Sequence, residues 1–172
     1  MRLFVAIDVD SSPFEEELKK IRDSVKCRAK FVDPGAMHIT LKFLGEVPGA
    51  RAISEKLDSL AGFGPFHIRL SGLGAFPSPG RPRVLWVGAI SDRLPLLAET
   101  VESLLRDFGE DSRKFHGHMT LARIKERCDL RELVGGYSGR MFSEFTADSI
   151  VLKESILMPG GPIYRTVHRV KL

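Results

Sequence analysis

Two stretches of this chain share one pattern, His38-Ile39-Thr40-Leu41 and His118-Met119-Thr120-Leu121. Each holds a histidine, an apolar residue, a threonine and a leucine, and the whole chain has only five histidines. Successive side chains of a β-strand point to opposite faces, so in each copy the histidine and threonine share one face. The repeat therefore predicts two strands that bring two imidazoles and two hydroxyls to a common site.

The elements around the two motifs follow the same order. A helix over about 11–27 precedes the first motif strand, 38–44, and a helix over about 94–108 precedes the second motif. Apolar residues on the first helix recur at helical spacing and form a stripe. Other segments predict strands at 2–8, 30–32, 66–73, 83–90, 145–154 and 163–170, a helix at 49–60 and a helical turn at 129–134. We expect an α+β fold over 1–172, with two similar lobes whose mostly antiparallel sheets carry outer helices around a central cleft.

The composition is that of an ordinary globular protein. Of 172 residues, 43% are hydrophobic and 28% are charged, and the formal net charge is +4. No apolar run approaches the roughly 20 residues that span a bilayer, and the start of the chain reads as a first strand and not a signal peptide. We therefore expect a cytoplasmic protein with no membrane partner. Cys27 and Cys128 have no metal-type or redox-type spacing, which predicts two unpaired thiols.

Paired histidines with paired threonines suit acid–base chemistry on an anionic group. A neutral imidazole accepts a proton, a protonated one donates it, and hydroxyls can donate to phosphate oxygens. Regular alternation puts Lys42 on the face of His38, as a candidate for binding substrate charge. It puts Arg123 on the face opposite His118, unless the strand ends or bulges near Ala122.

With both motifs in view, the chain resembles the 2H phosphoesterase superfamily, in the branch of RNA 2′,3′-cyclic phosphodiesterases, also called LigT-like or 2′-5′ RNA ligase-like proteins. The motifs stand here as His38-Ile39-Thr40-Leu41-Lys42-Phe43-Leu44-Gly45 and His118-Met119-Thr120-Leu121-Ala122-Arg123. The likeness extends to the opening strand 2–8, to 83–88 and to 161–164. Where the family commonly has proline before the second histidine, Gly117 stands here, which we expect to loosen the approach to the strand.

The resemblance implies hydrolysis of 2′,3′-cyclic phosphate ends of RNA to 2′-phosphomonoesters, with tRNA fragments as one candidate substrate. It implies His38 as proton donor and His118 as proton acceptor, with Arg123 as a phosphate clamp. The two motifs are too similar for the sequence alone to order the two histidines. No metal or other cofactor is expected, and an internal pseudo-twofold needs no partner subunit, so we expect a monomer.

Three alternatives stay open. An RNA-end binding protein would keep the site without turnover, and the reverse reaction would join RNA ends through a 2′,5′ linkage. His116 and His118, with His38 as a third ligand, have a spacing that can bind zinc. No phosphate-binding loop of the Gly-x-x-x-x-Gly-Lys-Ser/Thr type is present, so ATP-driven ligation has no support.

Aromatic and basic side chains outside the motifs are weaker candidates. Phe76, Trp86 and Tyr164 are able to stack on a terminal base, although burial is the commoner role of such residues. Tyr164, beside a Gly-Gly-Pro turn, is the best of the three. Arg81 and Arg83 flank a loop rich in proline and glycine, 74–82, and are candidates for RNA phosphates or, alternatively, part of a solvated loop.

Overall fold

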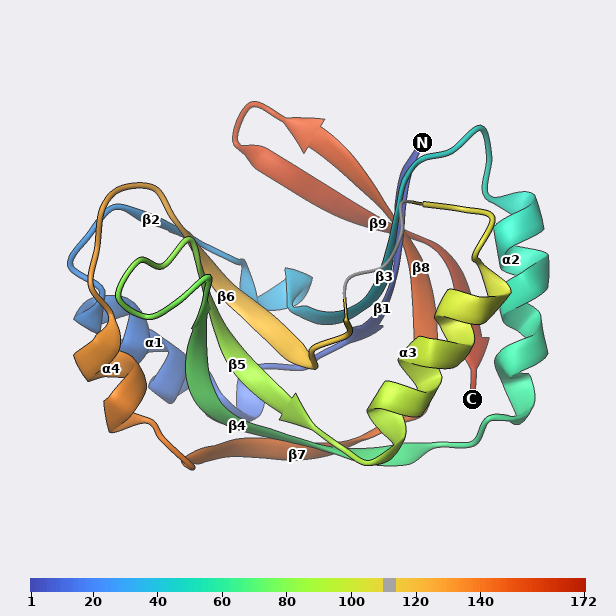
Figure 1. Cartoon of the computed structure of the whole chain (residues 1–172). Helices are drawn as coiled ribbons and strands as arrows, with labels where there is room; N and C mark the ends of the chain where they lie inside the picture. Colours follow the sequence, from blue (N-terminus) through green and yellow to red (C-terminus); the bar gives the residue numbers. More distant parts are fainter. Residues whose placement is uncertain (110–113) are drawn as a thin grey trace.

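The computed structural model describes residues 1–109 and 114–172, which form one curled sheet with helices on its outer face (Figure 1). The strands are β1 (Arg2–Asp8), β2 (Ala29–Phe31), β3 (His38–Glu46), β4 (Phe66–Phe76), β5 (Val84–Ile90), β6 (His118–Ile124), β7 (Met141–Ala147), β8 (Ser149–Met158) and β9 (Gly161–Lys171). The helices are α1 (Glu15–Ser24), α2 (Arg51–Leu57), α3 (Arg93–Leu104) and α4 (Arg131–Gly136), with 3-10 turns η1 (Ser12–Phe14), η2 (Pro34–Ala36) and η3 (Asp58–Gly62).

The sheet has the strand order β7-β4-β5-β6-β3-β1-β8-β9, with β2 paired to β6. All the strand pairs described are antiparallel. This confirms the predicted α+β fold with mostly antiparallel sheets and two lobes. The lobes are not separate sheets, however, because the pairing of β3 with β6 makes them continuous.

The chain crosses between the lobes several times. Helix α1 follows β1, yet it lies with α4 beside the lobe of β4, β5, β6 and β7 (Figure 1). Helix α3 follows β5, yet it packs against β3 in the other lobe. The helix that precedes each motif strand thus covers the lobe of the other motif strand, and neither lobe is a contiguous half of the chain.

One predicted element was wrong. The expected strand over 145–154 is two strands, β7 and β8, separated at Asp148. Strand β7 pairs with β4 at one edge of the sheet, whereas β8 pairs with β1 and β9 near the other edge. Local periodicity cannot detect this break, because both strands have the same two-residue repeat and differ only in their partners.

A buried apolar cluster lies between the sheet and the helices and draws residues from both lobes, among them Ile7, Ile39, Leu85 and Met119. A second, smaller cluster of Phe4, Ala6 and Val151 packs with Tyr164. The first cluster holds the motif strands in place through their apolar residues, which leaves the alternate side chains free for the site.

The two cysteines form a disulfide, so the prediction of unpaired thiols was wrong. Cys27 follows α1 and Cys128 precedes α4, and their Cα atoms lie 6.0 Å apart although 101 positions separate them. The fold brings these two segments together, which spacing along the chain could not reveal. No helix in the described ranges is both long and apolar enough to cross a membrane.

Candidate active site

The two motifs meet at their second residues. Ile39 of β3 is the antiparallel partner of Met119 of β6, and both side chains are fully buried. Continued by one residue in each direction, this register sets His38 across from Thr120 and Thr40 across from His118. Both histidines and both threonines are partly exposed, so the motif strands carry them on one accessible face, which we call the site face.

The two imidazoles are held in the same way. Nδ1 of His38 lies 2.7 Å from the carbonyl oxygen of Ala36, and Nδ1 of His118 lies 2.7 Å from the carbonyl oxygen of His116. A carbonyl only accepts hydrogen bonds, so Nδ1 of each ring carries a proton and donates it. In the neutral ring Nε2 is then the nitrogen that can accept a proton, and in the charged ring it can donate one.

Each motif strand contains a bulge at the same position. Along β1, Val5 pairs with Lys42 and Ala6 with Thr40, so Leu41 is an extra residue in β3. Along β5, Leu85 pairs with Ala122 and Trp86 with Thr120, so Leu121 is an extra residue in β6. A bulge shifts the alternation of side chains by one residue, so every position beyond it changes face.

The bulge in β3 turns Lys42 away from the site. Its side chain is 4% exposed, and its ammonium lies 2.6 Å from the carboxylate of Glu102 on α3. The predicted substrate-binding role rested on a face shared with His38, and that placement was wrong. Phe43 takes the site face in its place and is 65% exposed.

The bulge in β6 has the opposite consequence for Arg123. This residue is exposed and, beyond the extra residue Leu121, lies on the face of His118 and Thr120. From the sequence, Arg123 was expected on the face of His118 only if the strand ended or bulged near Ala122. The structure has a bulge at the neighbouring residue, Leu121. Arg123 is also the strand partner of Lys30 in β2, whose ammonium donates to the carbonyl of Gly160 in the β8–β9 turn. Two cations therefore lie side by side at this end of the site face.

Aromatic rings flank each imidazole. The ring of His38 lies 5.0 Å from that of Phe4 and 5.2 Å from that of Tyr164, which meets it edge-on. On the other strand, the ring of His118 lies 5.0 Å from that of Phe76 and 5.9 Å from that of Trp86.

Tyr164 was predicted at the site and lies there, against His38. Trp86 was expected among buried aromatics, yet it lies beside His118. Its ring covers Gly74, where a Cβ would come within 2.2 Å of the indole. Glycine at this position therefore lets the indole lie against the strand.

Burial of the two imidazoles lowers their pKa values. For His38, loss of solvent lowers the pKa most, and the hydrogen bond to Ala36 opposes that shift. For His118, burial again lowers the pKa and the hydrogen bond to His116 opposes it. Both rings thus bind a proton less readily than an imidazole in water, whose pKa is about 6.5.

Sequence reasoning missed a charged pair beside His38. Asp8 is the strand partner of His38, and its carboxylate lies 2.6 Å from the ammonium of the buried Lys153 and 3.1 Å from the guanidinium of Arg169. Lys153 lowers the pKa of His38, and Asp8 raises it. At the matching position beside His118 stands Gly88, so this pair distinguishes the two histidines. No pattern in the sequence links Asp8 with Lys153, since 145 positions separate them.

Among the described residues, the remaining histidines belong to no group of side chains suited to a metal ion. His116 packs against Trp86, with ring centres 4.8 Å apart. Throughout residues 1–109 and 114–172, no three His, Cys, Asp or Glu side chains gather in a way that could hold a metal ion. His67 pairs with Glu144 and His168 with Asp58. The alternative of a three-histidine zinc site is therefore not supported.

Gly117, which precedes the second motif, is tightly packed. Its carbonyl accepts a hydrogen bond from the amide of Ala89, at 3.0 Å, and a Cβ at this position would come within 2.5 Å of the Ala89 carbonyl oxygen. The expectation that glycine loosens the approach to β6 was wrong. The absence of a side chain instead lets the backbone lie close to the end of β5.

Comparison with known proteins points to the LigT-like phosphoesterases, the class that the two motifs resemble. The family model described as LigT like Phosphoesterase matches residues 7–86 and 87–164, one motif in each range. An RNA 2′,3′-cyclic phosphodiesterase of Archaeoglobus fulgidus is 41% identical over 98% of this chain and 98% of its own length. A protein of the same name from Aeropyrum pernix is also 41% identical, over 90% of this chain and 94% of its own length.

Solved structures similar to this fold include proteins of the same class. A crystal structure from Thermus thermophilus has a TM-score of 0.83 at 31% identity, covering 100% of this chain and 98% of its own. E. coli LigT complexed with 3′-AMP has a TM-score of 0.77 at 27% identity, covering 99% and 97% of the two chains. The chain belongs to the LigT-like phosphoesterase family and is an enzyme of that class.

Proposed function

We propose that this protein hydrolyses 2′,3′-cyclic phosphate ends of RNA to 2′-phosphomonoesters by metal-independent acid–base catalysis with two histidines. The observation that carries the proposal is the matched pair of imidazoles on one face, each held through Nδ1 by a backbone carbonyl. The relatives named RNA 2′,3′-cyclic phosphodiesterase over nearly the whole chain support this choice of substrate.

In the proposed reaction a water molecule attacks phosphorus in line with the departing 3′ oxygen. Nε2 of His118, neutral at the start, takes a proton from the water as the new P–O bond forms. Nε2 of His38, protonated at the start, gives its proton to the 3′ oxygen as the old P–O bond breaks. The products are a free 3′ hydroxyl and a 2′-phosphomonoester, and the two histidines exchange protonation states.

Negative charge on the phosphate needs donors that do not themselves react. The hydroxyls of Thr40 and Thr120 suit the two non-bridging oxygens, since each stands across the strand pair from the histidine of the other motif. Arg123, exposed on the same face, supplies a cation and a bidentate donor set for phosphate. Tyr164, whose ring meets that of His38 edge-on, is placed to pack against a nucleoside bound at His38.

The test is turnover of an RNA ending in a 2′,3′-cyclic phosphate in excess EDTA. We expect wild-type protein to form a 2′-phosphate, and His38→Ala and His118→Ala each to lower kcat/KM about 10²–10⁴-fold. The double variant should lose less than the product of the two single losses, because the two groups act in one step. His67→Ala is the matched control, since this exposed histidine pairs with Glu144 away from the motifs.

Each other outcome has a definite meaning. Binding of the RNA without turnover would replace the proposal with an RNA-end binding protein. Turnover that EDTA abolishes would overturn the metal-independent mechanism. Formation of a 2′,5′-linked product from added 5′-hydroxyl RNA, in place of hydrolysis, would assign the reverse reaction as the main activity.

A further inference from the structure

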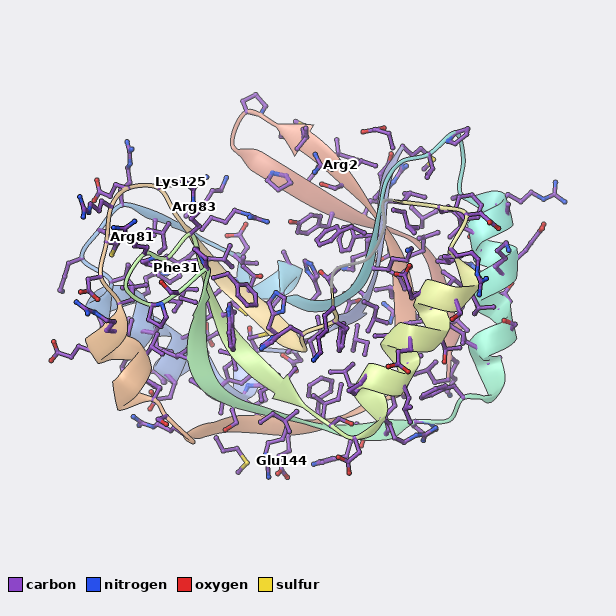
Figure 2. The ribbon with its side chains drawn as sticks, viewed as in Figure 1. Arg2, Phe31, Arg81, Arg83, Lys125 and Glu144 are labelled. Atoms are coloured by element: carbon purple, nitrogen blue, oxygen red, sulfur yellow. A yellow bond between two sulfur atoms is a disulfide. The ribbon has the colours of Figure 1, made fainter. Side chains whose placement is uncertain are left out.

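A groove of about 440 Å³ lies at one end of the sheet, away from the two motifs. The loop between β4 and β5 lines one side with Arg81, Pro82 and Arg83, and the segment after β6 lines the other. Figure 2 shows Arg81, Arg83 and Lys125 gathered at this end of the molecule. The residues of the second side are Ile124, Lys125, Glu126, Arg127 and Cys128.

The groove is strongly basic. Its lining has four cations, Arg81, Arg83, Lys125 and Arg127, and one carboxylate, Glu126. That carboxylate already accepts a hydrogen bond of 2.6 Å from the backbone amide of Arg28. Within 1–109 and 114–172, none of the four cations forms an ion pair with a carboxylate.

Some other surface arginines of this protein have acidic partners. Arg51 pairs with Glu55, and Arg165 pairs with Glu154. Four cations that converge on one hollow without such partners raise the local concentration of anionic ligands. The charge of the groove therefore suits a partner that carries several negative groups in a row.

The walls of the groove are fixed to each other. The amide of Ile124 donates to the carbonyl of Arg83, and the amide of Lys125 donates to the carbonyl of Arg28. The disulfide then ties Cys128, at the far end of this wall, to Cys27 beside Arg28. A binding surface held in this way loses little conformational entropy when a ligand arrives.

The groove also has a fixed relation to the catalytic face. Strand β6 runs from His118 to Ile124, with Arg123 on the site face just before the groove begins. At about 3.3 Å per residue, the cations lie roughly 20 Å from His118. A single nucleotide bound at the histidines cannot span this distance, whereas a strand of several nucleotides can.

We infer that the groove binds the phosphodiester backbone of single-stranded RNA several nucleotides before its cyclic end, through Arg81, Arg83, Lys125 and Arg127. This inference rests on the proposed function. Arg123 and Lys30 lie between the groove and the motifs and continue the same basic path. The groove contributes affinity for longer RNA and no part of the chemistry. The groove contacts only the charged backbone of the RNA, so we expect it to give no preference for particular bases.

The test compares two substrates, a nucleoside 2′,3′-cyclic phosphate and an RNA of about 12 nucleotides with a 2′,3′-cyclic end, a length within the usual range of single-strand sites. The variant is Arg81→Gln/Arg83→Gln. We expect its kcat/KM for the RNA to fall about tenfold, with no change for the mononucleotide. The slope of log affinity against log salt should decrease by about 1.4, at about 0.7 for each phosphate contact of a single strand.

Lys19→Gln/Arg51→Gln is the control, because it removes the same charge from α1 and α2. Three outcomes would each contradict RNA binding in the groove: an equal loss of kcat/KM on both substrates, no loss on the RNA, or the same loss in the control. Binding of the same RNA with a plain 3′ hydroxyl, measured by fluorescence anisotropy, distinguishes the groove proposal from the proposed function. If wild-type protein cleaves neither substrate, the proposed function fails. In that case weaker binding of this RNA by the groove variant, and not by the control, would still support RNA binding in the groove.

Discussion

Ile39 and Met119 lie opposite each other in the single pair that joins β3 to β6. Each is the apolar residue between the histidine and the threonine of its motif, and each is fully buried. The buried contact that makes the two lobes one sheet thus also sets two histidines and two threonines around one point. The site and the junction of the lobes are the same structural feature, so the distance between the imidazoles depends on this packing.

Replacement of either threonine by valine should slow the chemical step. Thr40→Val and Thr120→Val keep the shape and strand preference of the side chain but remove the hydroxyl that is proposed to donate to a non-bridging phosphate oxygen. We expect kcat to fall about 10²-fold for each, with the free energy of unfolding nearly unchanged. Steady-state kinetics and denaturant unfolding measure the two quantities. Serine at the same positions should restore most of the activity, and failure of that rescue would contradict the hydroxyl role.

The pH profile of kcat/KM should be bell-shaped with its maximum below pH 6.5. The rising limb reports the histidine that must be neutral, and the falling limb reports the one that must be protonated. Burial lowers the pKa of both His38 and His118, so both limbs move to the acid side of the ordinary histidine value of about 6.5.

The profile of kcat should lie at higher pH than that of kcat/KM. A bound phosphate anion favours the protonated imidazoles, and kcat reports the complex whereas kcat/KM reports the free enzyme. Rates on a nucleoside 2′,3′-cyclic phosphate between about pH 4 and 9 measure both profiles. A maximum of kcat/KM above pH 7 would contradict the effect of burial on these two groups.

Lys153→Met should identify which limb belongs to His38. The ammonium of Lys153 lowers the pKa of His38. Its removal leaves the neighbouring carboxylate of Asp8, which still pairs with Arg169, to favour the imidazolium. If His38 is the proton donor, the falling limb of kcat/KM moves to higher pH and the rising limb stays in place. Asp8→Asn should move the same limb to lower pH.

The control for this pair is Lys171→Met, an exposed lysine at the end of β9. It removes the same charge from the protein without approaching the site, so neither limb should move. A shift of the rising limb in Lys153→Met would reverse the assignment of acid and base between the two histidines.

Loss of the disulfide should destabilise the fold and leave the chemistry intact. Cys27 and Cys128 close a loop with a sequence separation of 101, and cross-linking a loop of about 100 residues stabilises a protein by about 4.7 kcal/mol in the chain-entropy account. We expect Cys27→Ser/Cys128→Ser to unfold roughly 10 °C lower in calorimetry. Its kcat/KM on a nucleoside 2′,3′-cyclic phosphate should stay unchanged. Reductant should lower the unfolding temperature of the wild type but not that of the variant.

The sequence by itself determined the two motif strands and the side chains that each presents to the site. His38 and Thr40 share a face, as do His118 and Thr120, because the alternation of a strand follows from the covalent geometry of a few consecutive residues. The antiparallel fold class and most strands and helices followed from equally local patterns, and the repeated order of elements predicted the two lobes.

Only the tertiary structure decided which face the residues beyond each motif occupy. The extra residues Leu41 and Leu121 turn Lys42 into the core and bring Arg123 to the site face. A bulge is a property of a strand and its neighbour together, so it leaves no mark in the local sequence. The disulfide, the Asp8–Lys153 pair and the separate courses of β7 and β8 depended on the fold for the same reason. Each is a contact between segments far apart in the chain, set by the packing of the whole sheet.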